Sequence, residues 1–131
     1  MLHHLSFGVT DIQRSSVFYD AVLAPLGYIR VWEDLEDDDA AVGYGIQGGG
    51  DKFAIKLCKY VAIGQGFHLA FSAKNQAEVE AFYTAAMANG GKDNGPAGLR
   101  PDYGGHYYAA FVIDPDGYRI EAVINTPPQQ N

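Results

Sequence analysis

Two histidines and two long charged side chains occupy equivalent positions in a repeated sequence. The stretch HHLSFGVTDIQRSSVFYDAVLAPLG begins at position 3, and HLAFSAKNQAEVEAFYTAAMANGG begins at position 68. A shift of 64 residues places His4 on His68, and a shift of 65 places Lys56 on Glu121. Imidazoles and carboxylates are common ligands of transition metals and common general acids and bases. The duplication therefore presents two matching sets of residues that could do chemistry.

Each copy of the repeat begins with an alternation of apolar and polar residues that is typical of a strand. In residues 5–9 the apolar side chains fall on one face, so that His4 falls on the opposite face. Residues 67–72 repeat this pattern and place His68 in the same way. The two histidines are therefore expected at equivalent places on two equivalent sheets.

The last strand of each copy places a charged side chain on the same face as the histidine. AIKLC (54–58) aligns with RIEAV (119–123), and the apolar members of both must face the helices. Lys56 then turns to the face that carries His4, and Glu121 joins His68. We predict that the duplication builds a shared concave pocket, in which Glu121 is the nearest partner for the Lys56 ammonium.

Helical spacing follows the first strand of each copy and predicts helices over residues 12–23 and 76–89. Asp11 (or Thr10) and Asn75 are suitable N-caps for them. The remaining segments have the length and spacing of short strands, which makes each copy a βαβββ unit. These strands are predicted at 28–32, 41–46, 52–58, near 92, at 107–113 and at 118–124.

The predicted fold class is α+β, with two paired βαβββ modules forming a cupped mixed sheet. The 131 residues suffice for one domain with a packed core. We expect that domain over residues 1–126, with modules at about 2–60 and 66–125. The last residues, 127–131, are expected to be a disordered tail.

Composition narrows the partners and the cellular setting. The net charge of −7 disfavours nucleic acid, whose phosphates would be repelled. The N-terminal stretch MLHHLSFG lacks a signal-peptide pattern, and the sequence has no apolar run long enough to span a bilayer. Cys58 is the single cysteine and cannot form an intrachain disulfide. These features predict a cytoplasmic globular protein that contacts neither nucleic acid nor membrane.

An Asp-Pro-Asp-Gly turn at 114–117 fixes the register of the last two strands. With a bulge at Gly117, this turn pairs Phe111 with Glu121. Tyr107 and Phe111 then line the pocket. A slip of one residue would reverse that placement.

The connection over residues 90–108 is rich in glycine and long, as lids and binding edges often are. Arg100, Tyr103 and His106 are its chemically capable members. His106 could act as a general base near neutral pH, or it could be an exposed loop histidine. Both interpretations of His106 remain open.

Taken together, these motifs resemble the vicinal-oxygen-chelate superfamily. The carriers of the resemblance are a histidine in the first strand, a helix with Phe-Tyr, a second histidine after the midpoint, and the run DPDGYRIEAV. The resemblance extends from about Leu2 to Ile124. The superfamily includes glyoxalase I, extradiol dioxygenases, thiol-transferring fosfomycin resistance proteins and bleomycin-binding proteins. It implies two modules in a cupped sheet, which in the catalytic members holds a divalent metal and an oxygen-rich substrate.

The resemblance places His4, His68 and Glu121 at the family's metal-ligand positions. Such a set suits manganese, iron, nickel or zinc and leaves positions open for substrate. Glyoxalase I has a second glutamate at the remaining position, which is Lys56 in this sequence. The chain departs from the glyoxalase pattern at that residue.

Two functions follow from the resemblance. In the first, a metal-dependent lyase, dioxygenase or transferase polarises a small oxygenated substrate, and Glu121 or His106 moves a proton. In the second, the same cup lacks a metal and sequesters a small molecule, as bleomycin-binding relatives do. Family members commonly pair modules across chains, so a homodimer is expected. The expected substrate contacts are Lys56, Arg100, Tyr103, Tyr107 and Phe111.

Overall fold

A computed structural model describes residues 1–127 of the chain, and its helices fall where the sequence predicts them. The helix α1 spans Ile12–Leu23 and α2 spans Gln76–Ala88, so α2 ends one residue before the predicted end. Two short 3-10 helices that the sequence analysis did not predict are η1 (Ala24–Leu26) and η2 (Pro101–Tyr103).

Four strands of the first module form sheet A, in the order β1-β4-β3-β2. The edge strand β1 is parallel to β4, and the other neighbours are antiparallel. The bounds of these strands are β1 (Leu5–Val9), β2 (Ile29–Asp34), β3 (Ala41–Gly45) and β4 (Phe53–Leu57).

The second module repeats this plan in sheet B, in the order β5-β9-β8-β6, with β7 also paired to β8. The strand β5 is parallel to β9, as β1 is to β4. The bounds are β5 (Leu69–Ser72), β6 (Lys92–Asp93), β7 (Gly98–Leu99), β8 (Tyr108–Ile113) and β9 (Arg119–Ile124). The predicted α+β fold of paired βαβββ modules is confirmed.

The N-caps of both helices are the residues that the sequence predicts. The Asp11 carboxylate accepts a hydrogen bond from the Arg14 backbone N–H at 3.0 Å, and the Asn75 side chain accepts one from Glu78 N–H at 2.8 Å. These bonds satisfy backbone donors that have no partner within a helix. The chain leaves η1 through Gly27, whose φ of 91° suits glycine.

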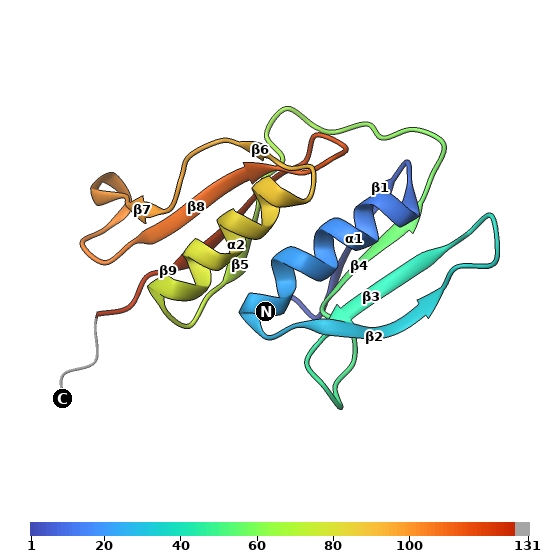
Figure 1. Cartoon of the computed structure of the whole chain (residues 1–131), viewed down its shortest axis with the longest axis horizontal. Coiled ribbons are helices and arrows are strands. Elements are labelled where there is room, and N and C mark those ends of the chain that lie inside the picture. Colours follow the sequence, from blue (N-terminus) through green and yellow to red (C-terminus); the bar gives the residue numbers. More distant parts are fainter. Residues whose placement is uncertain (128–131) are drawn as a thin grey trace.

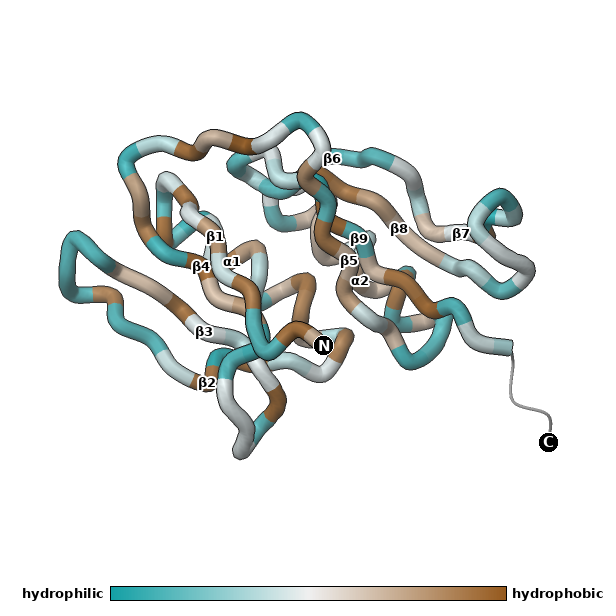
Figure 2. Tube along the Cα trace, turned by 180° about the vertical axis from the view of Figure 1, so that it is seen from behind, coloured by the Kyte–Doolittle hydropathy of each residue, from teal (hydrophilic) through white to brown (hydrophobic). Residues whose placement is uncertain are grey.

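The two helices lie side by side in the middle of the molecule, with sheet A on one side and sheet B on the other (Figure 1). Hydrophobic segments concentrate in the strands and helices, and the tip between β2 and β3 is hydrophilic (Figure 2). Aromatic rings join the modules, because Phe7 of β1 stacks on Tyr118 at 3.9 Å between centroids and contacts Phe67 at 5.9 Å. The core is therefore shared between the two modules.

The turn at 114–117 also ties the second module to the first. Gly117 has a φ of 101°, and the Asp114 N–H donates to the Tyr118 carbonyl at 2.8 Å, as the predicted register requires. The Tyr19 hydroxyl of α1 donates to the Asp114 carboxylate at 2.6 Å. Next to it, the Asp116 carboxylate accepts a hydrogen bond from the Ser15 hydroxyl at 3.2 Å.

The long connection between α2 and β8 carries more structure than a single loop. The strands β6 and β7 pair with the same edge of β8, and η2 follows β7. Of the expected tail, Pro127 is exposed and residues 128–131 lie outside the described residues.

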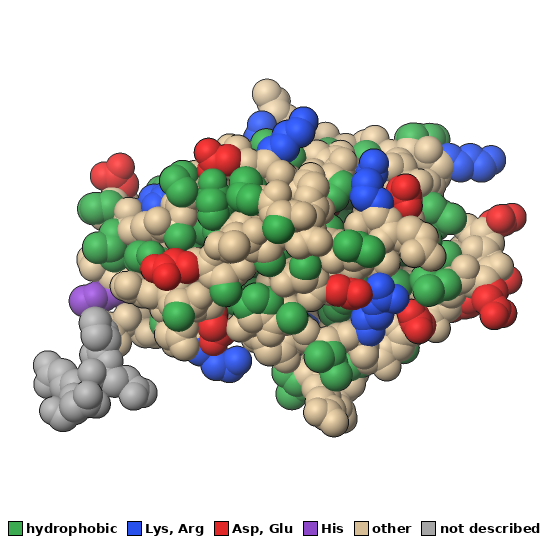
Figure 3. Space-filling view, viewed as in Figure 1, with side chains coloured by type: hydrophobic (Ala, Val, Ile, Leu, Met, Phe, Trp, Pro, Cys, Tyr) green, Lys and Arg blue, Asp and Glu red, His purple; other side chains and the backbone are tan. Residues whose placement is uncertain are grey.

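Acidic side chains gather at one end of the molecule, over the connection between β2 and β3 (Figure 3). The run EDLEDDD (33–39) begins at the end of β2 and continues through this connection, and its members are exposed. Among residues 1–127, neither helix is long and apolar enough to cross a bilayer.

Candidate functional site

The face of each sheet that is turned away from its helix is called its outer face below. On the outer face of sheet B, the His68 imidazole Nε2 contacts the Glu121 carboxylate Oε1. The parallel register of β5 and β9, which pairs Ala70 with Glu121, brings the two side chains together. Glu121 is buried, with 3% of its side chain exposed, whereas 44% of the His68 side chain is exposed. The pair therefore has a shielded carboxylate and an accessible imidazole.

Tyr107 holds the other oxygen of the same carboxylate. Its hydroxyl donates to Glu121 Oε2 at 2.8 Å. Burial, together with this bond and the nearby negative charge, raises the pKa of Tyr107 to about 12. The ring of Tyr103, from η2, packs edge to face on Tyr107 at 5.3 Å. Both oxygens of Glu121 thus have protein partners.

Phe111 continues the cluster across the sheet. It lies directly opposite Glu121 in the β8–β9 register, as predicted. Its ring centroid is 5.9 Å from that of His68, and the Arg100 guanidinium carbon lies 5.2 Å from its centre, a cation–π contact. The alternate strand position, Tyr108, turns to the helix side and donates to Glu80 of α2 at 2.7 Å.

These contacts cross sheet B in one row, from β5 through β9 and β8 to the connection that carries Arg100. The group is called the sheet B cluster below, and it unites six residues that the sequence analysis had singled out. Its members are His68, Arg100, Tyr103, Tyr107, Phe111 and Glu121.

Lys56 lies on the outer face of sheet A, not in the sheet B cluster. It is exposed and stands beside Gly8 and Ala41 in the strand registers. Within residues 1–127 it makes no ion pair, since Glu121 lies on the other sheet, where His68 and Tyr107 contact its carboxylate. The expected Lys56–Glu121 pair is therefore not formed within one chain.

His4 also stands apart from the sheet B cluster. It is exposed, and its Nδ1 lies 2.8 Å from that of His3. It lines a cleft of about 340 Å³ between the modules, beside Lys52 and Phe53. Across residues 1–127, no three His, Cys, Asp or Glu side chains gather as a metal site would require. One chain thus contributes at most two of the three expected ligands to a common site.

His106 lies in the turn before β8 and makes no hydrogen bond to Glu121, whose partners among residues 1–127 are His68 and Tyr107. It is exposed and lines a separate cleft near the start of α2, together with Lys74 and Asn75. The structure therefore does not bring His106 to the carboxylate that it was expected to assist.

One feature of the cluster was not predicted from the sequence, namely that Gly95 and Gly98 lie against the Arg100 guanidinium. A Cβ at Gly95 would lie 3.2 Å from Arg100 Nη2, and one at Gly98 would lie 3.2 Å from Nη1. The spacing of these two glycines before an arginine was visible, but only folding shows that the guanidinium lies against them.

The His68–Glu121 pair has the chemistry of half a transition-metal site. One imidazole nitrogen and one carboxylate oxygen converge, and both atom types suit manganese, iron, nickel or zinc. Tyr107 orients the second carboxylate oxygen through a hydrogen bond, and residues around metal sites often orient the metal ligands in this way. The residues present therefore fit two ligands of such an ion.

The chain combines two βαβββ modules with a histidine–glutamate pair on the outer face of one sheet, and these features can be compared with those of known protein families. Residues 1–122 match the Glyoxalase/Bleomycin resistance protein/Dioxygenase superfamily, and the chain belongs to it. The resemblance seen in the sequence is thereby confirmed.

Particular relatives cover nearly the whole chain. It is 35% identical to the lactoylglutathione lyase of Salmonella typhimurium over 130 residues, covering 93% of this chain and 90% of that protein. The lactoylglutathione lyase of Escherichia coli O157:H7 is 37% identical, with the same coverage. A solved glyoxalase/bleomycin resistance protein from Albidiferax ferrireducens T118 superposes with a TM-score of 0.73 at 33% identity, covering 92% of this chain and 94% of that one.

Proposed function

We propose that the protein is a metal-dependent enzyme of the lyase type that binds a small oxygenated molecule on the outer face of sheet B. The observation that supports this proposal is the convergence of His68 and Tyr107 on the buried Glu121 carboxylate. A carboxylate with 3% exposure and oriented oxygens is suited to hold a cation or to accept a proton.

In this proposal, the residues of the sheet B cluster have different roles. Tyr107 fixes Glu121 Oε2, which leaves Oε1, beside the accessible His68 ring, as the oxygen available to a metal ion or to a proton of the substrate. Phe111 provides an apolar floor next to that oxygen. A divalent metal held by His68 and Glu121 would polarise a substrate oxygen.

The third metal ligand in this proposal is His4 of a second copy of the chain. Within one chain His4 does not join His68 and Glu121. A homodimer in which the outer face of sheet A in one copy covers sheet B of the other would bring them together. Such a dimer would contain two equivalent sites. We place it in the cytoplasm, because the single Cys58 is a free thiol.

The relatives suggest the first substrate to assay. Since they are named lactoylglutathione lyases, we propose the hemithioacetal of methylglyoxal and glutathione, whose conversion to lactoylglutathione is followed by absorbance. Wild type loaded with nickel or zinc is compared with Glu121→Gln. Activity that Glu121→Gln lacks supports this substrate, and equal rates for the two proteins contradict it.

A second candidate function is a metal-free protein that sequesters a small molecule. The observation that favours it is Lys56, an exposed cation at the place in sheet A that Glu121 occupies in sheet B. If the faces meet in a dimer, that ammonium would oppose a divalent cation. The cluster would then bind a carbonyl or anionic ligand directly.

A metal analysis with subunit mixing tests the metal proposal and the dimer together. We expect untagged wild type to hold about one divalent ion per chain, and His4→Ala and His68→Ala to hold far less. In mixed dimers of the two variants, one of the two sites is intact and regains its metal. Wild type that binds no metal points to the sequestering function, and mixtures that stay metal-free contradict a site shared between chains.

A further inference from the structure

We propose that Arg100 binds a carboxylate of the substrate. The site would then take a small molecule with its oxygenated end at His68 and Glu121 and a carboxylate at its other end. This inference rests on the proposed function, because it assigns the substrate class of the same face. It concerns a group outside the expected metal set.

The guanidinium of Arg100 is held in place before any ligand binds. Its Nη2 donates to the Pro96 carbonyl at 2.6 Å. Beneath it, Gly95 has a φ of 138°, and a Cβ there would meet both Nη2 and the Phe111 ring at 3.2 Å. Other side chains rarely adopt that backbone conformation, so glycine provides both the turn and the space. Arg100 is therefore half-buried, and its guanidinium is held against the backbone of this connection.

Within residues 1–127, the half-buried Arg100 and the exposed Arg119 have no carboxylate partner, whereas the other two arginines of this acidic protein have one. Arg14 pairs with Asp116 at 3.0 Å, and Arg30 pairs with Asp20 at 2.8 Å. Within the described part of the chain, no carboxylate lies within ion-pair distance of Arg100. A guanidinium that is fixed but unpaired has donors left for a planar carboxylate.

The position of Arg100 relative to the Glu121 carboxylate defines the shape of the ligand. Phe111 has the guanidinium on one side, at 5.2 Å, and the His68 ring on another, at 5.9 Å. A ligand that reaches both must cross Phe111 with a flat or apolar middle part. Because one guanidinium balances one negative charge, a single carboxylate matches the site better than a phosphate dianion does.

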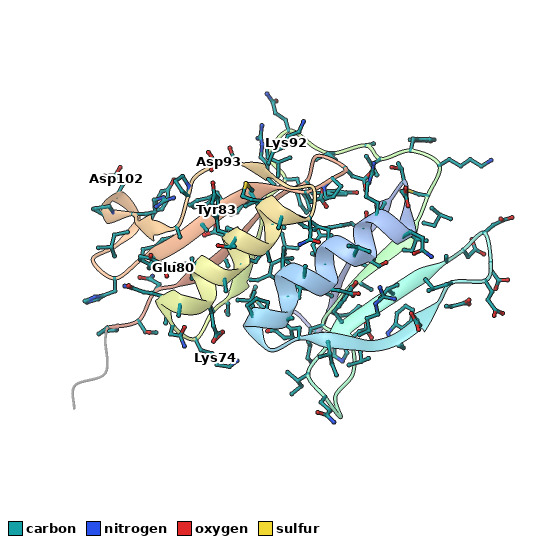
Figure 4. All side chains as sticks on the ribbon, viewed as in Figure 1. Lys74, Glu80, Tyr83, Lys92, Asp93 and Asp102 are labelled. Carbon is teal, nitrogen blue, oxygen red and sulfur yellow. The ribbon has the colours of Figure 1, made fainter. Side chains whose placement is uncertain are left out.

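The probe 3,4-dihydroxybenzoate has this shape, with vicinal oxygens at one end and a carboxylate at the other. Its methyl ester keeps the oxygens and the ring but lacks the charge. Binding of both is measured by calorimetry to nickel-loaded and chelator-treated wild type, Arg100→Gln, His68→Ala and Lys92→Gln. Lys92→Gln is the matched control, because it removes one positive charge from an exposed residue of β6 that is not a member of the cluster (labelled in Figure 4).

We expect Arg100→Gln to weaken binding of the acid by about 10-fold or more, the usual effect of losing a charge-assisted pair. Binding of the ester should change less than about 2-fold, and Lys92→Gln should leave both affinities unchanged. An acid-to-ester preference that is equal in wild type and Arg100→Gln overturns the inference, as does failure of the acid to bind wild type. Failure of the proposed function gives another result, in which His68→Ala and metal removal alter neither affinity while Arg100→Gln still does.

Discussion

The outer faces of sheets A and B are built on equivalent strands and carry different side chains. Sheet B presents the buried Glu121 with His68 and Tyr107 around it. Sheet A presents small residues, and Trp32 lies so close over Gly43 that a Cβ there would be 2.2 Å from the indole nitrogen. The small residues of that face are Gly8, Ala41, Gly43 and Ala54.

The two modules share one strand arrangement, whereas the side chains on the outer faces of their sheets differ. Strand register depends on backbone hydrogen bonds and on the apolar side that packs on the helices. Both requirements are met equally by Lys56 and Glu121, because each points away from the core. One face could therefore keep a polar cluster while the other became a surface of small residues around an exposed lysine.

The largest expected effect is a difference in unfolding free energy between equivalent core substitutions in the two modules. Phe7 and Phe71 are equivalent in the repeat, but Phe7 is 8% exposed and stacks on Tyr118, whereas Phe71 is only half-buried. Phe7→Ala should lower the free energy of unfolding by about 3–5 kcal/mol, the usual cost of a large-to-small core change. Phe71→Ala should cost clearly less. Urea unfolding of the two variants measures the difference, and equal losses would contradict an asymmetric core.

A second matched pair tests the contact between α1 and the turn at 114–117. Tyr19 is fully buried and donates to Asp114, and burial together with the neighbouring carboxylate raises the pKa of Tyr19. Tyr19→Phe should cost about 1–3 kcal/mol of unfolding free energy, because it leaves a buried carboxylate oxygen without its donor. The equivalent Tyr83→Phe, on the half-buried face of α2, is the control and should leave the urea midpoint nearly unchanged. A neutral Tyr19→Phe would mean that water replaces the hydroxyl.

Making the two faces more alike should strengthen metal binding. If sheet A of one copy covers sheet B of another, Lys56→Glu replaces an opposing ammonium with a second carboxylate. We expect the affinity for nickel or zinc to rise by about 10-fold or more, since such ions favour imidazole and carboxylate ligands. Lys59→Glu is the control for added negative charge, because Lys59 lies beyond the end of β4. Equal affinities of wild type and Lys56→Glu would place Lys56 outside the site.

The smallest expected effect is a dependence of stability on pH that comes from Asp114. Burial raises the pKa of this carboxyl above its ordinary value of 3.8, more than its hydrogen bonds lower it. Such a group contributes stability that is complete below the unfolded-state pKa and is lost as the pH rises through the folded-state pKa. The unfolding free energy of wild type, relative to Asp114→Asn, should therefore improve as the pH falls from 7 to 4.

Asp102→Asn is the companion variant for that measurement, because Asp102 lies exposed in η2 (Figure 4). Comparing it with wild type over the same pH range shows the effect of losing a carboxyl that has no buried contact. If wild type loses stability relative to Asp114→Asn on acidification, the assignment of burial as the dominant cause is wrong.

Local sequence patterns determined the two long helices, most of the strands and the register of the last two strands. The apolar alternation of β1 and β5, the N-caps Asp11 and Asn75, and the turn at 114–117 act over a few residues, so they are visible without the fold. The same turn sets Phe111 opposite Glu121, since the length of a tight turn fixes which residues of its two strands pair. Repetition of the pattern predicted two modules of one plan.

Only the tertiary structure decided which of the equivalent side chains meet. His4 and His68 look interchangeable in the repeat, yet only His68 lies against a carboxylate among the described residues of the chain. Likewise, neither Arg100 nor the glycines before it show in sequence that the guanidinium rests beside Phe111. Strand pairing across the sheet and the packing of one module on the other set these distances, and both join residues that are far apart in sequence.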